Sequence, residues 1–199
     1  MSRTIFAILA AGSFLLLNPA FAVTPIPTDP IYIRIDNGWK GLYAHNDEYA
    51  EYSLVGSEIK LQDSYHILLK PGLGLMVTFA DKKEFATGKD LLELHRQWEI
   101  EYWRKHASKV ESTSRDDLGG ARQDIKVTEL TLYNKEGKQL KVCLIGLASK
   151  EGVFVFSISP ANEGIDLIVK KLVSSIKVVH TRLDAQESAK QSKFAAGIK

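Results

Sequence analysis

Five histidines and one cysteine are the side chains in this sequence best suited to acid–base, nucleophilic or metal chemistry. The histidines are His45, His66, His95, His106 and His180. Cys143 lies in the largely apolar run 140–145, which is typical of a strand in which a thiol packs as a small hydrophobic side chain. A catalytic thiolate needs electropositive, accessible surroundings and a nearby base, and the local sequence offers neither. We therefore expect Cys143 to be buried and inert.

The pair His95 and Glu99 has a spacing that could serve a metal. The two residues are four apart in a segment with helical periodicity, so they share one face of the helix. His106 lies on nearly the same line, but about 16 Å further along the axis, which is too far to share an ion with His95. Because no third ligand is visible nearby, we expect a His–Glu pair on the helix surface or half-buried, and no metal or other cofactor.

An acidic group interleaved with tyrosines is the best sequence candidate for a recognition surface. The group consists of Tyr43, Asp47, Glu48, Tyr49, Glu51 and Tyr52. The glycine-containing pattern of a calcium loop is absent, so we expect a solvated loop. Tyrosine supplies contact area together with a polar tip, which makes this group the predicted partner-binding surface.

The patterns that usually mark a catalytic site are missing. Gly-x-Ser-x-Gly is absent, and Gly72-Leu73-Gly74 lacks the rest of a phosphate-binding motif. Other readings stay open beside protein binding: an immunity or inhibitor protein, a small-ligand or metal carrier, or an enzyme with a scattered site. Such a site would be built from His45, His66 and Cys143, or from the His95 and Glu99 pair.

The first 22 residues have the pattern of a secretory signal peptide. Arg3 is followed by the apolar run 5–17, and Ala20-Phe21-Ala22 provides small residues for cleavage near Ala22. A single cysteine suits export to a bacterial periplasm, where a domain must be stable without disulfides. No second apolar stretch reaches membrane length. With 26 basic and 24 acidic residues, the chain has no charge excess that favours nucleic acid.

The hydrophobic pattern predicts two helices and many short strands. The first helix covers 89–106, with Leu91, Leu94, Trp98 and Tyr102 on its core-facing side. The second opens at Asn162 as N-cap and buries apolar residues at 3–4 spacing between 165 and 176. The expected strands are 31–35, 52–55, 58–61, 65–69, 74–80, 121–133, 139–148, 153–158 and 177–179. Asn37-Gly38 predicts one hairpin and Gly56-Ser57 another.

This order predicts an α+β protein: an α-β-α sandwich with a mainly antiparallel sheet, two main helices and extra N-terminal strands. The expected organisation is a signal peptide at 1–22, a single domain at 23–181 and a mobile tail at 182–199. The placement of the strands between 31 and 62 in the sheet stays open.

The stretch 65–181 resembles the PsbP-like family, which includes DcrB-type periplasmic proteins. The resembling features are YHILLKPGLGLMVTFA, the helix KDLLELHRQWEIEYWRK, the turn and strand DDLGGARQDIKVTELTLY, and GVFVFSISPANEGIDLIVKKLVSSIKVV. The resemblance implies an α-β-α sandwich that acts as a binding or assembly factor, with no shared catalytic residues. Together with the signal pattern, it predicts an exported periplasmic accessory protein that docks on a protein partner in the cell envelope.

Overall fold

The computed structural model describes most of the chain between residues 31 and 180. The described residues are 31–35, 38–45, 48–55, 60–61, 66–70, 72–85, 88, 90–161 and 164–180. The predicted signal peptide, the predicted tail 182–199, Asp47 and the predicted N-cap Asn162 lie outside them. Within this part of the chain, no helix is long and apolar enough to cross a membrane.

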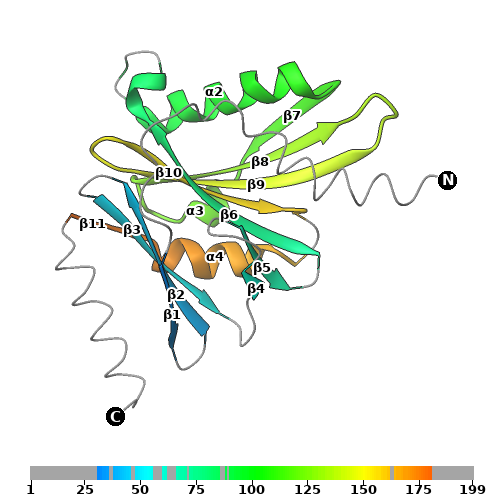
Figure 1. Cartoon of the computed structure of the whole chain (residues 1–199). Coiled ribbons are helices and arrows are strands. Elements are labelled where there is room, and N and C mark those ends of the chain that lie inside the picture. The colour runs from blue at the N-terminus through cyan, green and yellow to red at the C-terminus, as the bar shows by residue number, and fades with distance from the viewer. Residues whose placement is uncertain are drawn as a thin grey trace, which may run out of the picture.

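A seven-stranded antiparallel sheet forms the centre of the molecule (Figure 1). Its strands, in spatial order, are β4 (Lys60–Leu61), β5 (His66–Lys70), β6 (Leu73–Asp81), β10 (Gly152–Ser159), β9 (Gln139–Ala148), β8 (Ile125–Tyr133) and β7 (Lys109–Ser114). The predicted meander of β8, β9 and β10 is confirmed. The residues of β10 are all buried, because the strand lies between β6 and β9 and its two faces belong to two different core clusters.

A second, four-stranded sheet collects the N-terminal strands and the last strand. Its order is β1 (Ile31–Ile35), β2 (Gly38–His45), β3 (Glu48–Val55) and β11 (Lys177–Val179). The first predicted hairpin is confirmed, with Ile35 opposite Gly38. The hairpin predicted across 56–57 is wrong, because β2 and β11 occupy both edges of β3. The neighbouring strand β4 pairs instead with β5 in the large sheet.

Helix α2 (Leu91–His106) covers one face of the large sheet (Figure 1). The side chain of Asp90 caps it by accepting a hydrogen bond from the backbone N–H of Glu93. The predicted core-facing side is only partly right: Leu91, Leu94 and Trp98 are half-buried and pack against the core, but the buried residues are Leu92, His95, Glu99 and Ile100. The helix sits with Leu92 over Gly146, where an added Cβ would lie 3.2 Å from the leucine Cδ2.

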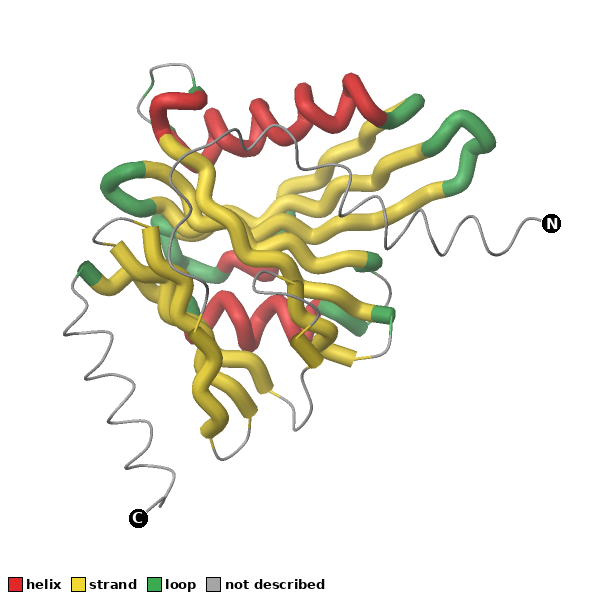
Figure 2. The backbone as a smooth tube through the Cα atoms, in the orientation of Figure 1, coloured by secondary structure: helices red, strands yellow, loops and turns green. Residues whose placement is uncertain are grey.

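Helix α4 (Asp166–Ser175) and the small sheet pack on the opposite face, which gives the layered arrangement in Figure 2. The predicted buried face of α4 is confirmed, and its fully buried residues are Val169, Leu172 and Val173. The helix begins later than predicted, at Asp166, because Gly164 turns the chain with a positive φ of 83°. The guanidinium of Arg122 donates to the carbonyls of Val173 and Ile176 and so satisfies the end of the helix.

The predicted α+β class, with two main helices on opposite faces of a mainly antiparallel sheet, is confirmed. The pattern did not predict β7, which is polar and largely exposed, or the short helix α3 (Asp116–Gly119) that follows it. A short 3-10 turn, η1 (Lys82–Glu84), follows β6. The junction of β7 and α3 carries Arg115, which lines the hollow described next.

Candidate functional site

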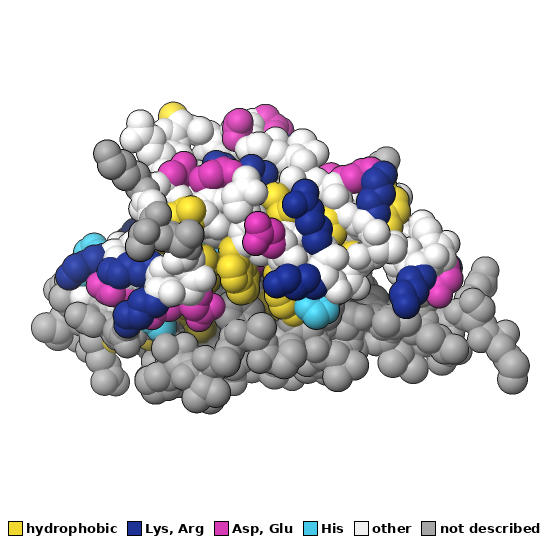
Figure 3. Space-filling view, turned by 90° about the horizontal axis from the view of Figure 1, so that it is seen from above, with side chains coloured by type: hydrophobic (Ala, Val, Ile, Leu, Met, Phe, Trp, Pro, Cys, Tyr) yellow, Lys and Arg dark blue, Asp and Glu magenta, His cyan; other side chains and the backbone are white. Residues whose placement is uncertain are grey.

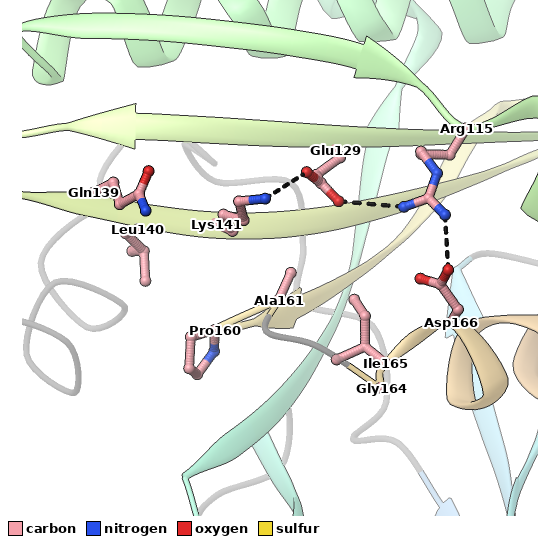
Figure 4. A pocket seen from close by; sticks show the side chains of 10 residues that line it. All are labelled: Arg115, Glu129, Gln139, Leu140, Lys141, Pro160, Ala161, Gly164, Ile165 and Asp166. Atoms are coloured by element: carbon pink, nitrogen blue, oxygen red, sulfur yellow. Dashed lines mark hydrogen bonds and ion pairs between the residues drawn. The ribbon is translucent and has the colours of Figure 1, made fainter.

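A polar hollow lies between the start of β9 and the connection from β10 to α4 (Figure 4). Its volume is about 820 Å³, which is within the range of ligand-binding pockets. It is lined by Arg115, Glu129, Gln139, Leu140, Lys141, Pro160, Ala161, Gly164, Ile165 and Asp166. These residues come from four separate segments of the chain, so the hollow exists only in the folded domain.

One wall of the hollow is a chain of ion pairs that runs from β9 through β8 to α4 (Figure 4). Lys141 Nζ lies 3.3 Å from Glu129 Oε1, and Glu129 Oε2 lies 3.3 Å from Arg115 Nη1. Arg115 Nη2 in turn donates to Asp166 Oδ2 at 2.9 Å. Because Lys141, Glu129 and Arg115 are less than half exposed, these pairs are screened less than free surface charges.

The Arg115 guanidinium is the centre of this wall. Besides Glu129 and Asp166, it contacts Asp117 through two hydrogen bonds of 2.9 and 3.0 Å. The hydrogen bonds that Arg115 donates to Asp117 and then to Asp166 raise the pKa of Arg115 further above its ordinary value. Conversely, Arg115 lowers the pKa of the Asp117 carboxyl. The positive charge of Arg115 is thus already paired with carboxylates of the protein.

The opposite wall of the hollow is apolar. It consists of Pro160, Ala161 and Ile165, in the segment that leads from β10 into α4 (Figure 4). The backbone N–H of Ala161 donates to the carbonyl of Lys141 at 2.8 Å, so the two walls are tied together. The peptide bond before Pro160 is cis. A ligand in this hollow would meet charged groups on one side and apolar groups on the other.

Cys143 lies next to the ion-pair wall but is inaccessible. It is opposite Glu129 in the β8–β9 register and only 1% exposed, which confirms its predicted burial. Burial, with a smaller contribution from Glu129, raises the pKa of the thiol to about 12. A thiol of this kind holds its proton at neutral pH, so it contributes packing rather than a nucleophile.

The predicted partner-binding surface is not on the surface. The residues described there lie in β2 and β3, so the prediction of a solvated loop is wrong. Tyr43, Glu48, Glu51 and Tyr52 are buried, and Tyr49 is half-buried. These side chains therefore offer a partner little exposed area.

The two buried tyrosines belong to the core for a simple geometric reason. Alternation along paired strands sends Tyr43 and Tyr52 to the face of the small sheet that meets the large one. Their rings make edge contacts with Phe154 and Phe156, at centroid distances of 6.0 and 5.0 Å. Gly41, opposite Tyr52, leaves the space that the ring fills.

The two buried glutamates make hydrogen bonds and ion pairs within the protein. Glu48 accepts hydrogen bonds from the backbone N–H groups of Lys150 and Glu151, at 3.0 and 3.3 Å. Glu51 pairs with Lys40 at 2.8 Å and with Lys177 at 3.2 Å. Buried carboxylates need such partners, and these contacts explain how the strand β3 accommodates two buried acidic residues.

The predicted His95 and Glu99 pair exists, but it faces the sheet rather than solvent. The Nε2 atom of His95 lies 3.4 Å from Glu99 Oε1, and both residues are buried. The imidazole also packs against the rings of Phe85 and Trp98. Among the described residues, no group of three or more potential ligand side chains could hold a metal ion.

The scattered enzyme site is not assembled by the described residues. The buried ring of His45 is stacked on Phe79, with ring centroids 3.6 Å apart, and burial lowers its pKa. The charged groups that act on His45 are Asp81, Glu48, Glu151 and Lys83. Those that act on Cys143 are Glu129, Arg115 and Asp166. The two groups thus occupy different environments, and the side chain of His66 lies outside the described part.

Sequence reasoning missed the residues of the hollow because nothing local connects them. Lys141 is a charged position in the mostly apolar strand β9, and this was the one available signal, because Glu129 lies in a strand with several other polar residues. Arg115 and Asp166 are 51 residues apart and meet only through the fold.

On the described part of the α2 face, basic and acidic side chains are intermixed (Figure 3).

Comparison with known proteins adds no further site residue. No family model, no curated protein and no solved structure matches the chain. The resemblance to the PsbP-like family thus rests on the residue pattern of 65–181 alone.

Proposed function

We propose that the protein is a binding or accessory module that holds a segment of a partner protein in the hollow, without catalysing a reaction. The observation that carries this proposal is the hollow of about 820 Å³ with a charged wall facing an apolar wall. A protein segment offers charged, polar and apolar groups together, which is what these two walls require.

The chemistry of the hollow supports a binding role. Its charged residues Lys141, Glu129, Arg115 and Asp166 are paired with one another in a continuous chain. Such a preorganised network can orient the polar groups of a ligand without a large ordering cost. Acid–base catalysis would instead require a group with a pKa tuned towards neutrality beside the reacting atom.

The place of action follows from the N-terminal pattern. Residues 1–22 support export, with cleavage near Ala22, and the low cysteine content supports a periplasmic location. The partner would then be a protein of the cell envelope. The resemblance of residues 65–181 to periplasmic PsbP-like proteins supports the same proposal.

Site-specific photo-crosslinking tests the docking site. The full chain, produced in its native cells, would carry a photoreactive residue in place of Gln139, which is exposed and lines the hollow. The matched control carries it in place of Glu101, which is exposed on α2. We expect a discrete adduct from position 139 and none of the same mass from position 101. Identical adducts from both positions, or no adduct from 139, would refute docking in the hollow.

Binding by the purified partner provides the second readout. After the adduct is identified, the partner would be titrated against the protein and its Lys141→Gln variant. Lys141 is 42% exposed, so its replacement leaves the core intact. We expect a roughly two- to fivefold weaker affinity, the range for a partly exposed charge pair. An unchanged affinity would show that the adduct reports proximity only.

A further inference from the structure

The two ends of the hollow carry opposite charges that a ligand can reach. At one end, the Lys141 side chain is 42% exposed, and its ammonium, which has three donors, pairs with Glu129 among the described residues. At the other end, the Asp166 side chain is 53% exposed and is held by Arg115 through Oδ2. A ligand can therefore place an acceptor on Lys141 and a cation on Asp166 (Figure 4).

A ligand with charge of one sign fits this hollow poorly. An anion placed on Arg115 would meet the carboxylates of Asp117, Glu129 and Asp166 around it. The N-terminus of α4 is no better for an anion, since Asp166 in its first turn already complements the helix dipole. A ligand with two cations would meet the ammonium of Lys141. The paired charges of this wall thus favour a ligand that carries both a positive and a negative charge.

The distance between the ends sets the length of that ligand. The contacts from Lys141 to Glu129, Arg115 and Asp166 are 3.3, 3.3 and 2.9 Å in series. With the widths of the carboxylate and guanidinium groups, the ends are at most about 14 Å apart, which an extended peptide spans in roughly four residues. Between the ends, the half-buried Pro160 offers an apolar contact, and the buried Ala161 and Ile165 lie beside it in the lining.

We infer that the segment bound in the hollow is a dipolar peptide: an acidic residue on Lys141, an apolar residue against Pro160, and a basic residue on Asp166. This inference rests on the proposed docking function and specifies its ligand. The two charges of the segment lie about four positions apart along an extended chain.

Three acetylated, amidated pentapeptides test the inference. The mixed peptide is Glu-Ala-Leu-Ala-Arg, and the others carry Glu at both ends or Arg at both ends. Each would be titrated into the full chain by NMR, with the backbone amides of 139–141 and 164–166 as reporters. We expect the mixed peptide to bind at least about fivefold more tightly than either other peptide, because each of those places one like charge at an end. Equal affinities for the three would overturn the inference.

Charge-neutral variants assign each end separately. Asp166→Asn should weaken the mixed peptide about two- to fivefold, and should leave unchanged a peptide in which Gln replaces Arg. Lys141→Gln should likewise weaken the mixed peptide, and should leave unchanged a peptide in which Gln replaces Glu. Glu151→Gln and Lys150→Gln, in the turn between β9 and β10, are the matched controls and should change nothing. Equal losses for charged and neutral peptides would refute the assigned ends.

The outcomes separate this inference from the proposed function. A partner adduct at Gln139 with no peptide selectivity would refute the dipolar ligand and leave docking in place. Loss of that adduct, with or without peptide binding, would refute the docking function itself.

Discussion

Glu48 tests whether the acidic residues of β3 serve structure or recognition. Its carboxylate is 5% exposed and accepts hydrogen bonds from the N–H groups of Lys150 and Glu151, which lie more than 100 residues away in the turn between β9 and β10. It therefore joins the small sheet to the large one. We expect Glu48→Gln to destabilise the fold, because one of the two accepting oxygens becomes an NH2 group, a donor that faces a backbone N–H.

The expected magnitude follows from these two contacts. A hydrogen bond to a charged group contributes about 1.5–3 kcal/mol, and the 3.3 Å contact is the weaker of the two. Solvent can partly replace the carboxylate at the exposed backbone of Lys150, so we expect a net loss of about 2 kcal/mol. For a domain of this size, that corresponds to a decrease in Tm of about 4–8 °C.

Urea unfolding followed by tryptophan fluorescence would measure the loss. The matched control is Glu151→Gln, in the same turn. Its side chain is 34% exposed and pairs with Lys82 at 3.2 Å, so we expect a change below about 0.5 kcal/mol. If Glu48→Gln also changed the free energy of unfolding by less than about 0.5 kcal/mol, the structural role assigned to Glu48 would be refuted.

Three further predictions concern buried positions. Gly152→Ala should lower the free energy of unfolding by about 1–3 kcal/mol or more, because the new Cβ would lie 2.1 Å from the Ala80 carbonyl oxygen. A thermal melt would measure the effect, and an unchanged Tm would contradict the close approach of β10 and β6. Burial lowers the pKa of His45, so stability is fully present above its unfolded pKa of about 6.5 and is lost as pH falls through the folded pKa. His45→Phe should flatten that loss in urea titrations at several pH values, and an unaltered slope would exclude His45 as its source. Cys143 should react with a thiol reagent only after unfolding, because its thiol is buried with a pKa raised to about 12; fast labelling of the native chain would oppose this.

The sequence was sufficient for elements whose periodicity is strong. The β8–β10 meander and the buried face of α4 are found as predicted, because local alternation and 3–4 spacing determine them. The orientation of α2 was not predictable from residue type. Leu92 packs in the space above Gly146, which has no side chain. This contact fixes the rotation of α2 and places the polar pair His95 and Glu99 against the sheet. Such a fit depends on a partner surface that the helix sequence does not contain.

The site was less predictable than the fold for a related reason. The tyrosines of β2 and β3 looked suited to recognition because the local pattern did not reveal a second sheet, whose inner face buries Tyr43 and Tyr52. The hollow was missed because its charged wall joins Arg115, Glu129 and Asp166 across three elements. Only the packing of α3 against both β8 and α4 brings these residues together.

The pairing of β3 with β11 has a consequence for the order in which the chain can fold. It joins Tyr49 and Glu51 to Val179 and Lys177, so the small sheet lacks its last strand until almost the whole described chain is available. Until then, the edge of β3 has open backbone donors and acceptors, which is a hazard for aggregation. Ser175 reinforces the late closure by accepting a hydrogen bond from the N–H of Ser53, 122 residues earlier. Contacts of such long range slow folding, so a chain emerging in an unfolded form would need protection of this edge until its C-terminal part arrives.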